Sequence, residues 1–350
     1  MTMSFEPFRG DLEELERMAL VSYRDEYGLV SYINNYSSRY FDYLFGGLEQ
    51  RDHLLAAYDE DKIMAFTALI PRRYHFRGEI YRGLLGCLMV TRKEAFRRGL
   101  AMGLGAKALE LFHKYNYDFA LAFLDSGHRT SQMIKKLKVA GNRIQEIKRM
   151  AVIFRALDLG QLFAFDGTRW YQRAGMNFLN LDKLDAQSSP APIRLYQPRD
   201  LSACHELLDS YRQKVTLARV FEPEELAREL SYPEVAHTLV WEEAGKIRGL
   251  INWVLVEHIA RFTQPWAWLN HIYLEGLEEK DQCELVRSFL LHARAQKAVA
   301  VLEWFKNYYP RQALWKNRFV PYPRSMHVIA GVFNPNLDLT DIPDMFEVML

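Results

Sequence analysis

The chain has 350 residues, of which 49% are hydrophobic and 25% are charged, and its formal net charge is +1. This length favours two domains, and the composition is that of a globular protein with a sizeable core. The small net charge excludes a general attraction to nucleic acid or to an anionic membrane, so we expect neither as a partner. Three widely spaced cysteines, Cys87, Cys204 and Cys283, form no disulfide framework and no metal-ligand spacing, so we expect no metal.

The beginning of the chain predicts helices. Leu12, Leu15, Leu20 and Val21 stand among charges and predict an amphipathic helix within residues 11 to 24. Tyrosines recur at nearly four-residue spacing through residues 22 to 45, which indicates helix faces with aromatic packing. The first 16 residues lack the layout of a signal peptide, and no apolar run approaches the roughly 18 residues of a membrane span. We therefore expect a cytoplasmic protein.

Three strands follow, at residues 54–58, 63–76 and 81–90, and short polar turns separate them. Such short connections predict an antiparallel meander. Pro71 lies within the second of these strands, which indicates a sheet edge or a bulge because proline cannot donate a ladder hydrogen bond. Cys87 lies in the third strand, where a small core residue is the favoured interpretation.

The stretch after the third strand predicts an anion site. A short polar segment ends in Arg97-Arg98-Gly99, and Leu104, Ala108, Leu111 and Phe112 then follow at helical spacing. The first amide groups of a helix lack intrahelical partners and carry partial positive charge. A glycine there lets a phosphate approach the backbone, and two arginines add charge and bidentate donors. A solvated basic turn is the alternative interpretation of the same residues.

This stretch resembles motif A of the GNAT N-acetyltransferase superfamily, in which a strand is followed by a Gln/Arg-x-x-Gly-x-Gly/Ala loop. Val90 ends the strand, Gly99 and Ala101 match the last two motif positions, and Phe96 stands at the first in place of Gln or Arg. The resemblance implies that the pantetheine arm of coenzyme A lies against Leu88 and Val90 and that its pyrophosphate binds the amides of the loop. The implied coenzyme-binding residues are Leu88, Val90, Phe96, Arg97, Arg98, Gly99, Leu100, Ala101 and Met102.

The same resemblance identifies residues 118–124 as the fifth strand, which diverges from the fourth, and residues 131–137 as the motif B helix. Ile134 stands where many members carry a general-acid Tyr, and the fourth strand lacks the Glu that many members use as general base. The remaining catalytic candidates are Asp125, His128 and the terminal carboxylate of Leu350. A histidine near its ordinary pKa suits proton transfer. A capping Asp125, a solvent-facing His128 and a tail that only packs are the alternative interpretations.

The second half of the chain repeats the first. Residues 238–249 and 54–65 share a strand, an acidic turn, a Lys-Ile pair and a small residue two positions further on, which indicates a duplicated unit. Residues 275–281 of the second copy are acidic where a pyrophosphate needs donors. The chain therefore resembles the tandem GNAT proteins, a group that includes mycothiol synthases and N-myristoyltransferases, in which the degenerate half helps to shape the acceptor site.

The sequence thus predicts an α/β fold of two tandem GNAT-like domains, each a mostly antiparallel mixed sheet flanked by helices. The predicted divisions are a coenzyme-binding domain at residues 1–182, a linker at 183–192, a degenerate domain at 193–335 and a tail at 336–350. The resemblance implies an N-acyltransferase that uses an acyl-CoA, with acetyl-CoA favoured, and a small-molecule or peptide amine as acceptor. The alternative is a tandem GNAT protein that binds acyl-CoA or a partner without turnover, and an oligomer is compatible with either function.

Overall fold

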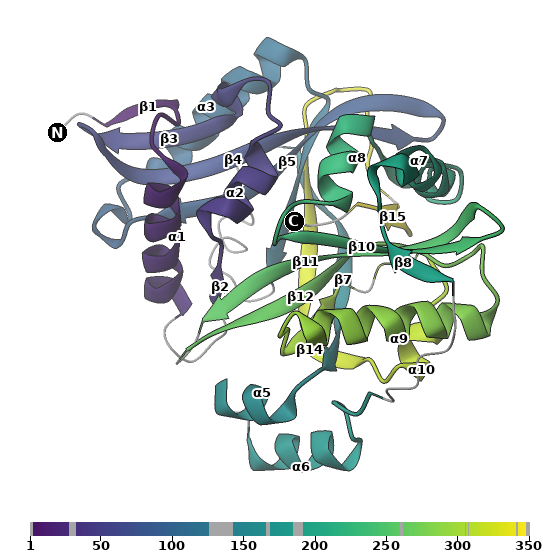
Figure 1. Cartoon of the computed structure of the whole chain (residues 1–350). Helices are drawn as coiled ribbons and strands as arrows, with labels where there is room; N and C mark the ends of the chain where they lie inside the picture. Colours follow the sequence, from purple (N-terminus) through teal and green to yellow (C-terminus); the bar gives the residue numbers. More distant parts are fainter. Residues whose placement is uncertain are drawn as a thin grey trace.

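The computed structural model describes residues 3–27, 33–125, 143–165, 169–184, 192–259, 262–304, 306, 308–340 and 342–347. Within these ranges the strands form one continuous sheet, and helices cover both of its faces (Figure 1). The predicted α/β class is confirmed. No helix in the described ranges is long and apolar enough to cross a membrane.

The first half contains a meander followed by a helix and a parallel strand. Its elements are β1 (Ser4–Pro7), α1 (Leu12–Tyr27), β2 (Ile33–Asn35), α2 (Ser38–Phe45), the 3-10 turn Arg51–His53, β3 (Leu54–Asp59), β4 (Lys62–Phe76), β5 (Glu79–Thr91), the 3-10 turn Lys93–Ala95, α3 (Leu100–Tyr115), β6 (Phe119–Asp125) and β7 (Ile144–Ala156). Strands β3, β4 and β5 pair antiparallel, as predicted, and β5 pairs with β6 in parallel. The tyrosine-rich region is not uniformly helical, because β2 lies between α1 and α2.

Alternating side chains divide the sheet of the first half between two cores. On one face, α3 packs through Leu104 and Phe112 against Leu69 of β4. On the other face, Phe66 of β4 lies in the core that contains the residues of α1 and α2. Helix α3 ends at Asn116, whose left-handed conformation (φ 52°) brings its amide to a helix carbonyl, as is common at helix ends.

Pro71 occupies a gap in the ladder of a central strand. One edge of β4 pairs with β3 as far as Ala68, and the same strand pairs with β9 only from Arg73 onward. Because proline has no N–H to donate, it is tolerated at the point where neither β3 nor β9 is opposite. Pro71 therefore lies at an unpaired point on one side of a central strand, and not on an edge strand.

The second half repeats the same order of elements. After α5 (Leu159–Phe165) and α6 (Trp170–Phe178) come β8 (Ile193–Leu195), the 3-10 turn Pro198–Asp200, α7 (Leu201–Asp209), the 3-10 turn Ser210–Gln213, β9 (Leu217–Val220), α8 (Pro223–Leu230), β10 (Ala236–Glu243), β11 (Lys246–Ile259), β12 (Thr263–Tyr273), α9 (Glu279–Ala295), β13 (Ala300–Glu303), α10 (Gln312–Lys316), β14 (Val320–Val332) and β15 (Met345–Phe346). Strands β10, β11 and β12 form an antiparallel meander, and β12 pairs with β13 in parallel. Figure 1 shows α9 on one side of this meander and α7 and α8 on the other.

The two halves exchange strands at the centre of the sheet. The strand order is β1-β3-β4-β5-β6-β14-β7-β13-β12-β11-β10-β8, so β14 of the second half pairs with β6 of the first. In return, β7 of the first half pairs with β13 of the second. Each half therefore completes the sheet of the other.

Candidate functional site

The start of α3 presents free backbone donors. Gly99 precedes the helix with φ 76° and ψ 11°, a left-handed conformation that disfavours any side chain. A Cβ at Gly99 would meet no atom within 4 Å, so the space beside it is open. Arg97 also has a positive φ of 64°. Within the described part of the chain, four amide groups of this turn have no hydrogen-bond acceptor: those of Arg97, Gly99, Leu100 and Ala101.

Three of the predicted coenzyme-binding residues use their amides internally. The amide of Phe96 donates to Lys93 at 3.1 Å, and that of Met102 donates to Gly99 at 3.0 Å. The amide of Arg98 likewise donates to Ala95 at 3.2 Å, so its guanidinium is the part of Arg98 that is available to an anion. The free donors are therefore fewer than the sequence motif implied, and they are concentrated around Gly99.

Positive charge surrounds this turn. The side chains of Arg97 and Arg98 are exposed, and a guanidinium nitrogen of Arg98 lies 3.9 Å from a carboxylate oxygen of Asp59. At this distance, and with Arg98 46% exposed, the pair leaves most donors of the guanidinium open to an anion. Leu100 is buried and fixes the first turn of α3 on the core, whereas the side chain of Met102 is exposed. The turn combines unpaired amides with two exposed guanidinium groups, which is the chemistry of a phosphate site.

The fourth and fifth strands separate next to this turn. Strands β5 and β6 pair from Gly83 opposite Phe119 to Gly86 opposite Ala122. Beyond that point β5 continues to Thr91 and β6 to Asp125, and no pair joins them. Among the described residues, no strand pairs with the side of β5 that faces β6 from Cys87 to Val90, directly before the turn that leads to α3.

A bulge lies on the free part of β5. The register between β4 and β5 shifts between Phe66 and Ala68, and Leu88 has a φ of 56°. A bulge re-aims the backbone, and a positive φ at a leucine is strained. Leu88 is partly buried and Val90 is buried. The two residues predicted to contact the pantetheine arm therefore lie on a distorted part of β5 that pairs with β4 on one side and, among the described residues, with no strand on the other.

The catalytic candidates lie mostly beyond what the structure describes. Asp125 is the last residue of β6, and its backbone pairs with Met326 of β14. His128, Leu350 and the predicted motif B helix with Ile134 lie outside the described residues. Among the described residues, no group of three or more His, Cys, Asp or Glu side chains is arranged to hold a metal.

The described part of the tail is docked. Met345 and Phe346 form β15, which pairs in parallel with β9, and Asp344 accepts hydrogen bonds of 2.6 and 2.7 Å from the amide and hydroxyl of Thr216. Glu347 is buried, and its carboxylate lies 3.6 Å from the guanidinium of Arg219. The tail is therefore held against the second half up to a point three residues before Leu350.

A buried ionic cluster that no sequence pattern predicted surrounds this docked tail. We call it the tail cluster, and its members are Arg72 of β4, Arg219 of β9, Glu225 and Glu229 of α8, His271 of β12 and Glu347. Burial alone would raise the pKa of Glu229, but the charge of Arg219 and the hydrogen bond from His271 hold that pKa well below its usual range. No local motif marks these residues, because β4, the neighbouring elements β9 and α8, β12 and the tail are brought together only by the fold.

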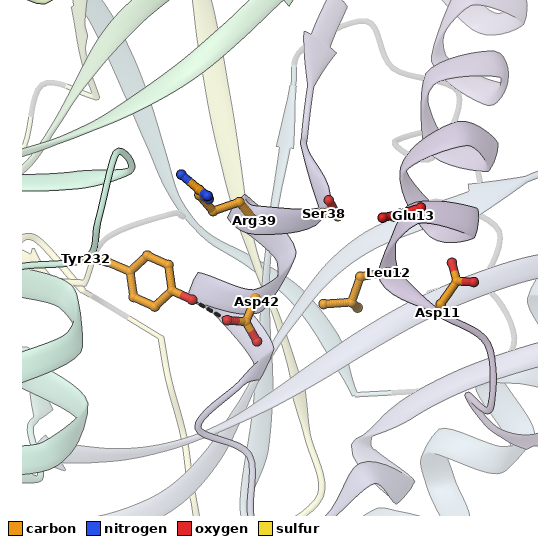
Figure 2. A pocket seen from close by; sticks show the side chains of 7 residues that line it. All are labelled: Asp11, Leu12, Glu13, Ser38, Arg39, Asp42 and Tyr232. Carbon is orange, nitrogen blue, oxygen red and sulfur yellow. Dashed lines mark hydrogen bonds between the residues drawn. The ribbon is translucent and has the colours of Figure 1, made fainter.

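Figure 2 shows a hollow in which the two halves meet. Its lining residues come from the start of α1, from α2 and from the loop after α8: Asp11, Leu12, Glu13, Ser38, Arg39, Asp42 and Tyr232. The hydroxyl of Tyr232 donates to the carboxylate of Asp42, which joins the second half to the first. Three carboxylates against one arginine make this rim favourable for a cation.

The parallel strands of the second half also separate, but a lysine fills the opening. Strands β12 and β13 pair at Ala267–Trp268 with Val301–Leu302, and β12 then continues to Tyr273. The ammonium group of Lys306 donates to the carbonyl oxygens of Leu269 and Asn270 at 3.1 and 2.7 Å. The first turn of α9 carries Glu279 and Asp281. The second half therefore blocks, with its own side chains, the positions that are open in the first.

Comparison with known proteins agrees with this geometry. No protein-family model and no curated protein sequence matches the chain. The structure of Saccharomyces cerevisiae N-myristoyltransferase with bound myristoyl-CoA is similar over 99% of this chain and 89% of that one, with a TM-score of 0.79 and 16% identity. A second structure of that enzyme with bound myristoyl-CoA has a TM-score of 0.76 and 16% identity, over 100% of this chain and 86% of that one.

A GCN5-related N-acetyltransferase from Anabaena variabilis is also similar, with a TM-score of 0.55 and 11% identity over 94% of this chain and 72% of that one. At these identities the likeness concerns the fold. The predicted fold resemblance is confirmed: this chain has the tandem GNAT fold.

Proposed function

We propose that this protein is an N-acyltransferase that transfers the acyl group of an acyl-CoA, with acetyl-CoA as the donor, to a primary amine of a small molecule or peptide. The observation that carries the proposal is the turn before α3, where unpaired amides of Arg97, Gly99, Leu100 and Ala101 lie beside the opening between β5 and β6. A diphosphate satisfies such donors, and an extended thiol arm fits along a free strand edge.

In the proposed reaction, a neutral amine attacks the thioester carbonyl carbon, the C–S bond breaks, and the coenzyme A thiolate leaves and is protonated. Backbone N–H groups on the free edge near Leu88 and Val90 are suited to polarise the carbonyl oxygen, which requires no side chain. Burial raises the pKa of the Cys87 thiol to about 12, so this cysteine is a poor nucleophile at neutral pH. These features favour direct transfer to the amine over an acyl-cysteine intermediate.

We place the acceptor at the junction of the two halves. Asp42 and Tyr232 meet there beside Asp11 and Glu13, and carboxylates attract a protonated amine before it loses its proton. Asp125, His128 and the Leu350 carboxylate remain the proposed candidates for the base. The division of the chain at residues 183–192 also remains a proposal.

The coenzyme site is tested by reversing one charge. Arg98→Glu is expected to weaken acyl-CoA binding by at least about tenfold in calorimetry, because a guanidinium–phosphate contact is lost and repulsion replaces it. Lys107→Glu, on the same helix but paired with Glu110 at its surface, is the matched control and should leave affinity unchanged. Equal affinities for wild type and Arg98→Glu would overturn the proposed site.

A turnover assay distinguishes an enzyme from a protein that binds acyl-CoA without turnover. Acyl-CoA donors from acetyl to myristoyl, offered with a panel of amines, should release free thiol at an amine-dependent rate. A longer acyl donor is a second candidate, because the similar S. cerevisiae enzyme binds myristoyl-CoA. Tight acyl-CoA binding with no thiol release for any donor and amine would favour the non-catalytic function.

A further inference from the structure

Helix α2 turns a row of tyrosines toward the core. Tyr36, just before the helix, and Tyr40 and Tyr43 within it are all buried. The ring centroids of Tyr36 and Tyr40 lie 5.0 Å apart, and those of Tyr40 and Tyr43 lie 5.8 Å apart. Arg39 and Asp42 of the same helix are exposed and line the hollow in Figure 2. The helix therefore presents charged groups to the hollow and phenol groups to the core.

Two of these three hydroxyl groups are left without a hydrogen bond. The hydroxyl of Tyr36 accepts a bond of 2.7 Å from the side-chain amide of Asn34. The hydroxyl groups of Tyr40 and Tyr43 have no partner among the described residues, although each side chain is only 2% exposed. Burying a hydroxyl without a partner costs about 1–3 kcal/mol. A native protein keeps such a group where water or a ligand completes the bond, or where a function requires it.

Of the two, Tyr40 is the one beside β5. Tyr40 belongs to the core against which Cys87 and Leu88 of β5 pack. Burial raises the pKa of Tyr40 well above its ordinary value, and the neighbouring Cys87 acts in the same direction. Burial also raises the pKa of Tyr43, but there the neighbouring charges belong mainly to the tail cluster. The phenol of Tyr40 is therefore a neutral donor next to the part of β5 that pairs with no strand on its β6 side.

Two hydroxyl groups fix this part of β5. The hydroxyl of Ser22 on α1 donates to the carbonyl oxygen of Thr91 at 2.9 Å, and the hydroxyl of Thr67 on β4 donates to the carbonyl oxygen of Cys87 at 3.3 Å. The distorted residue Leu88 lies between these two anchors. The backbone along which the proposed function places the thioester is thus held at both ends, on the face that α1 and α2 cover.

We propose that the hydroxyl of Tyr40 is a catalytic hydrogen-bond donor to the sulfur of the acyl-CoA while the C–S bond breaks. This inference rests on the proposed function, because it requires a thioester beside β5. Backbone amides are suited to the carbonyl oxygen, but the sulfur also gains negative charge and needs a donor of its own.

The donor keeps its proton. A thiol has an ordinary pKa of about 8.5, below that of a buried phenol, so the sulfur receives a hydrogen bond from Tyr40 and not its proton. The proton that the coenzyme A thiolate finally takes up balances the one that the amine nitrogen loses when its bond to the acyl carbon forms.

The first test titrates coenzyme A on the full-length protein and requires no turnover. A hydrogen bond to a charged group favours the charged form. Below the pKa of the thiol, the fraction of bound coenzyme A present as thiolate should therefore be at least about tenfold higher on wild type than on Tyr40→Phe, measured by the ultraviolet absorbance of the thiolate. Tyr308→Phe is the matched control: Tyr308 is buried in the core of the second half, its hydroxyl also lacks a partner among the described residues, and its variant should titrate as wild type does.

The same variants are compared in turnover and in stability. Tyr40→Phe should lower kcat at least about tenfold and leave the calorimetric affinity for acyl-CoA unchanged, because the donor acts on charge that develops only as the bond breaks. It should not lower the free energy of unfolding, since phenylalanine keeps the ring contacts and removes an unpaired buried hydroxyl. A merely structural hydroxyl would give the opposite result, with lower stability and unchanged kcat.

The outcomes separate this inference from the proposed function. Thiol release by wild type together with equal thiolate fractions on wild type and Tyr40→Phe would overturn the role of Tyr40 alone. An unchanged kcat of Tyr40→Phe would overturn it as well. No thiol release by wild type with any donor and amine would overturn the proposed function, and the catalytic role of Tyr40 with it.

Discussion

The ammonium group of Lys306 lies 3.2 Å from the carboxylate of Glu303, and both side chains are closed to water inside the second half. Burial lowers the pKa of Lys306, whereas Glu303 acts in the opposite direction. Tyr309 donates a further hydrogen bond of 2.7 Å to Glu303. The lysine thereby satisfies two carbonyl groups of β12 at the point where its parallel partner ends.

Replacing this lysine should destabilise the protein strongly. Lys306→Met leaves Glu303 charged and buried without its cation, a loss for which about 3–5 kcal/mol is expected. Urea unfolding of the wild type and of the variant measures this loss in the free energy of unfolding. Lys62→Met, which removes a surface pair with Glu94, is the control, with about 0–1 kcal/mol expected. Similar losses in the two variants would show that the buried pair has no special role.

Two glycines near the start of α3 should respond in opposite directions to the same substitution. Gly99→Ala places a Cβ on a left-handed residue, which costs about 1–2 kcal/mol and shifts the free amides, so acyl-CoA should bind more weakly. Gly105→Ala lies inside the helix with no atom within 4 Å of the new Cβ, and should stabilise by up to about 1 kcal/mol without changing affinity. Thermal unfolding and calorimetry measure both effects. Equal affinities of the two variants would contradict the role of the Gly99 turn.

Mild acid should destabilise the protein through its buried histidines. Burial lowers the pKa of His271, although its contact of 2.7 Å with Glu229 acts in the opposite direction. The unfolded chain takes up a proton at this histidine near about pH 6.5, where native His271 stays neutral, so stability falls as pH drops below that value. The contribution of Glu229, whose pKa is lowered in the native state, is retained until pH falls below about 4.

His271→Gln should therefore lose less stability than wild type between about pH 7 and about pH 5, whatever its absolute stability. Urea unfolding at the two pH values gives the comparison. His292→Gln, an exposed position, is the control and should follow wild type. Burial also lowers the pKa values of His53 and His237. These two histidines therefore keep part of the pH dependence of stability in every variant.

The tail should loosen when its buried carboxylate is neutralised. Glu347→Gln removes one of the carboxylates that balance Arg219, and a loss of about 1–3 kcal/mol is expected. Amide hydrogen exchange should become faster at Met345 and Phe346, which pair with β9. Glu243→Gln, which breaks a surface pair with Arg248, should leave this exchange unchanged. Equal protection of β15 in wild type and Glu347→Gln would show that strand pairing alone holds the tail.

The sequence by itself determined what depends on short-range patterns. The strand-forming runs and short polar turns at residues 54–90 predicted the first meander, and the helical spacing after Gly99 predicted α3. The repeat near residue 238, together with the GNAT resemblance, predicted the tandem fold. The separation of β5 from β6 agrees with what the GNAT resemblance implied, and the left-handed conformation of Gly99 agrees with a glycine at that position.

The tertiary structure decided what depends on contacts between distant segments. Three features join residues that no local pattern relates. They are the exchange of β7 and β14, the lysine between β12 and β13, and the ion pair of Arg72 with Glu229. Local propensity restricts each segment to helix or strand. Tertiary packing then decides which charged groups are buried together and which faces stay exposed.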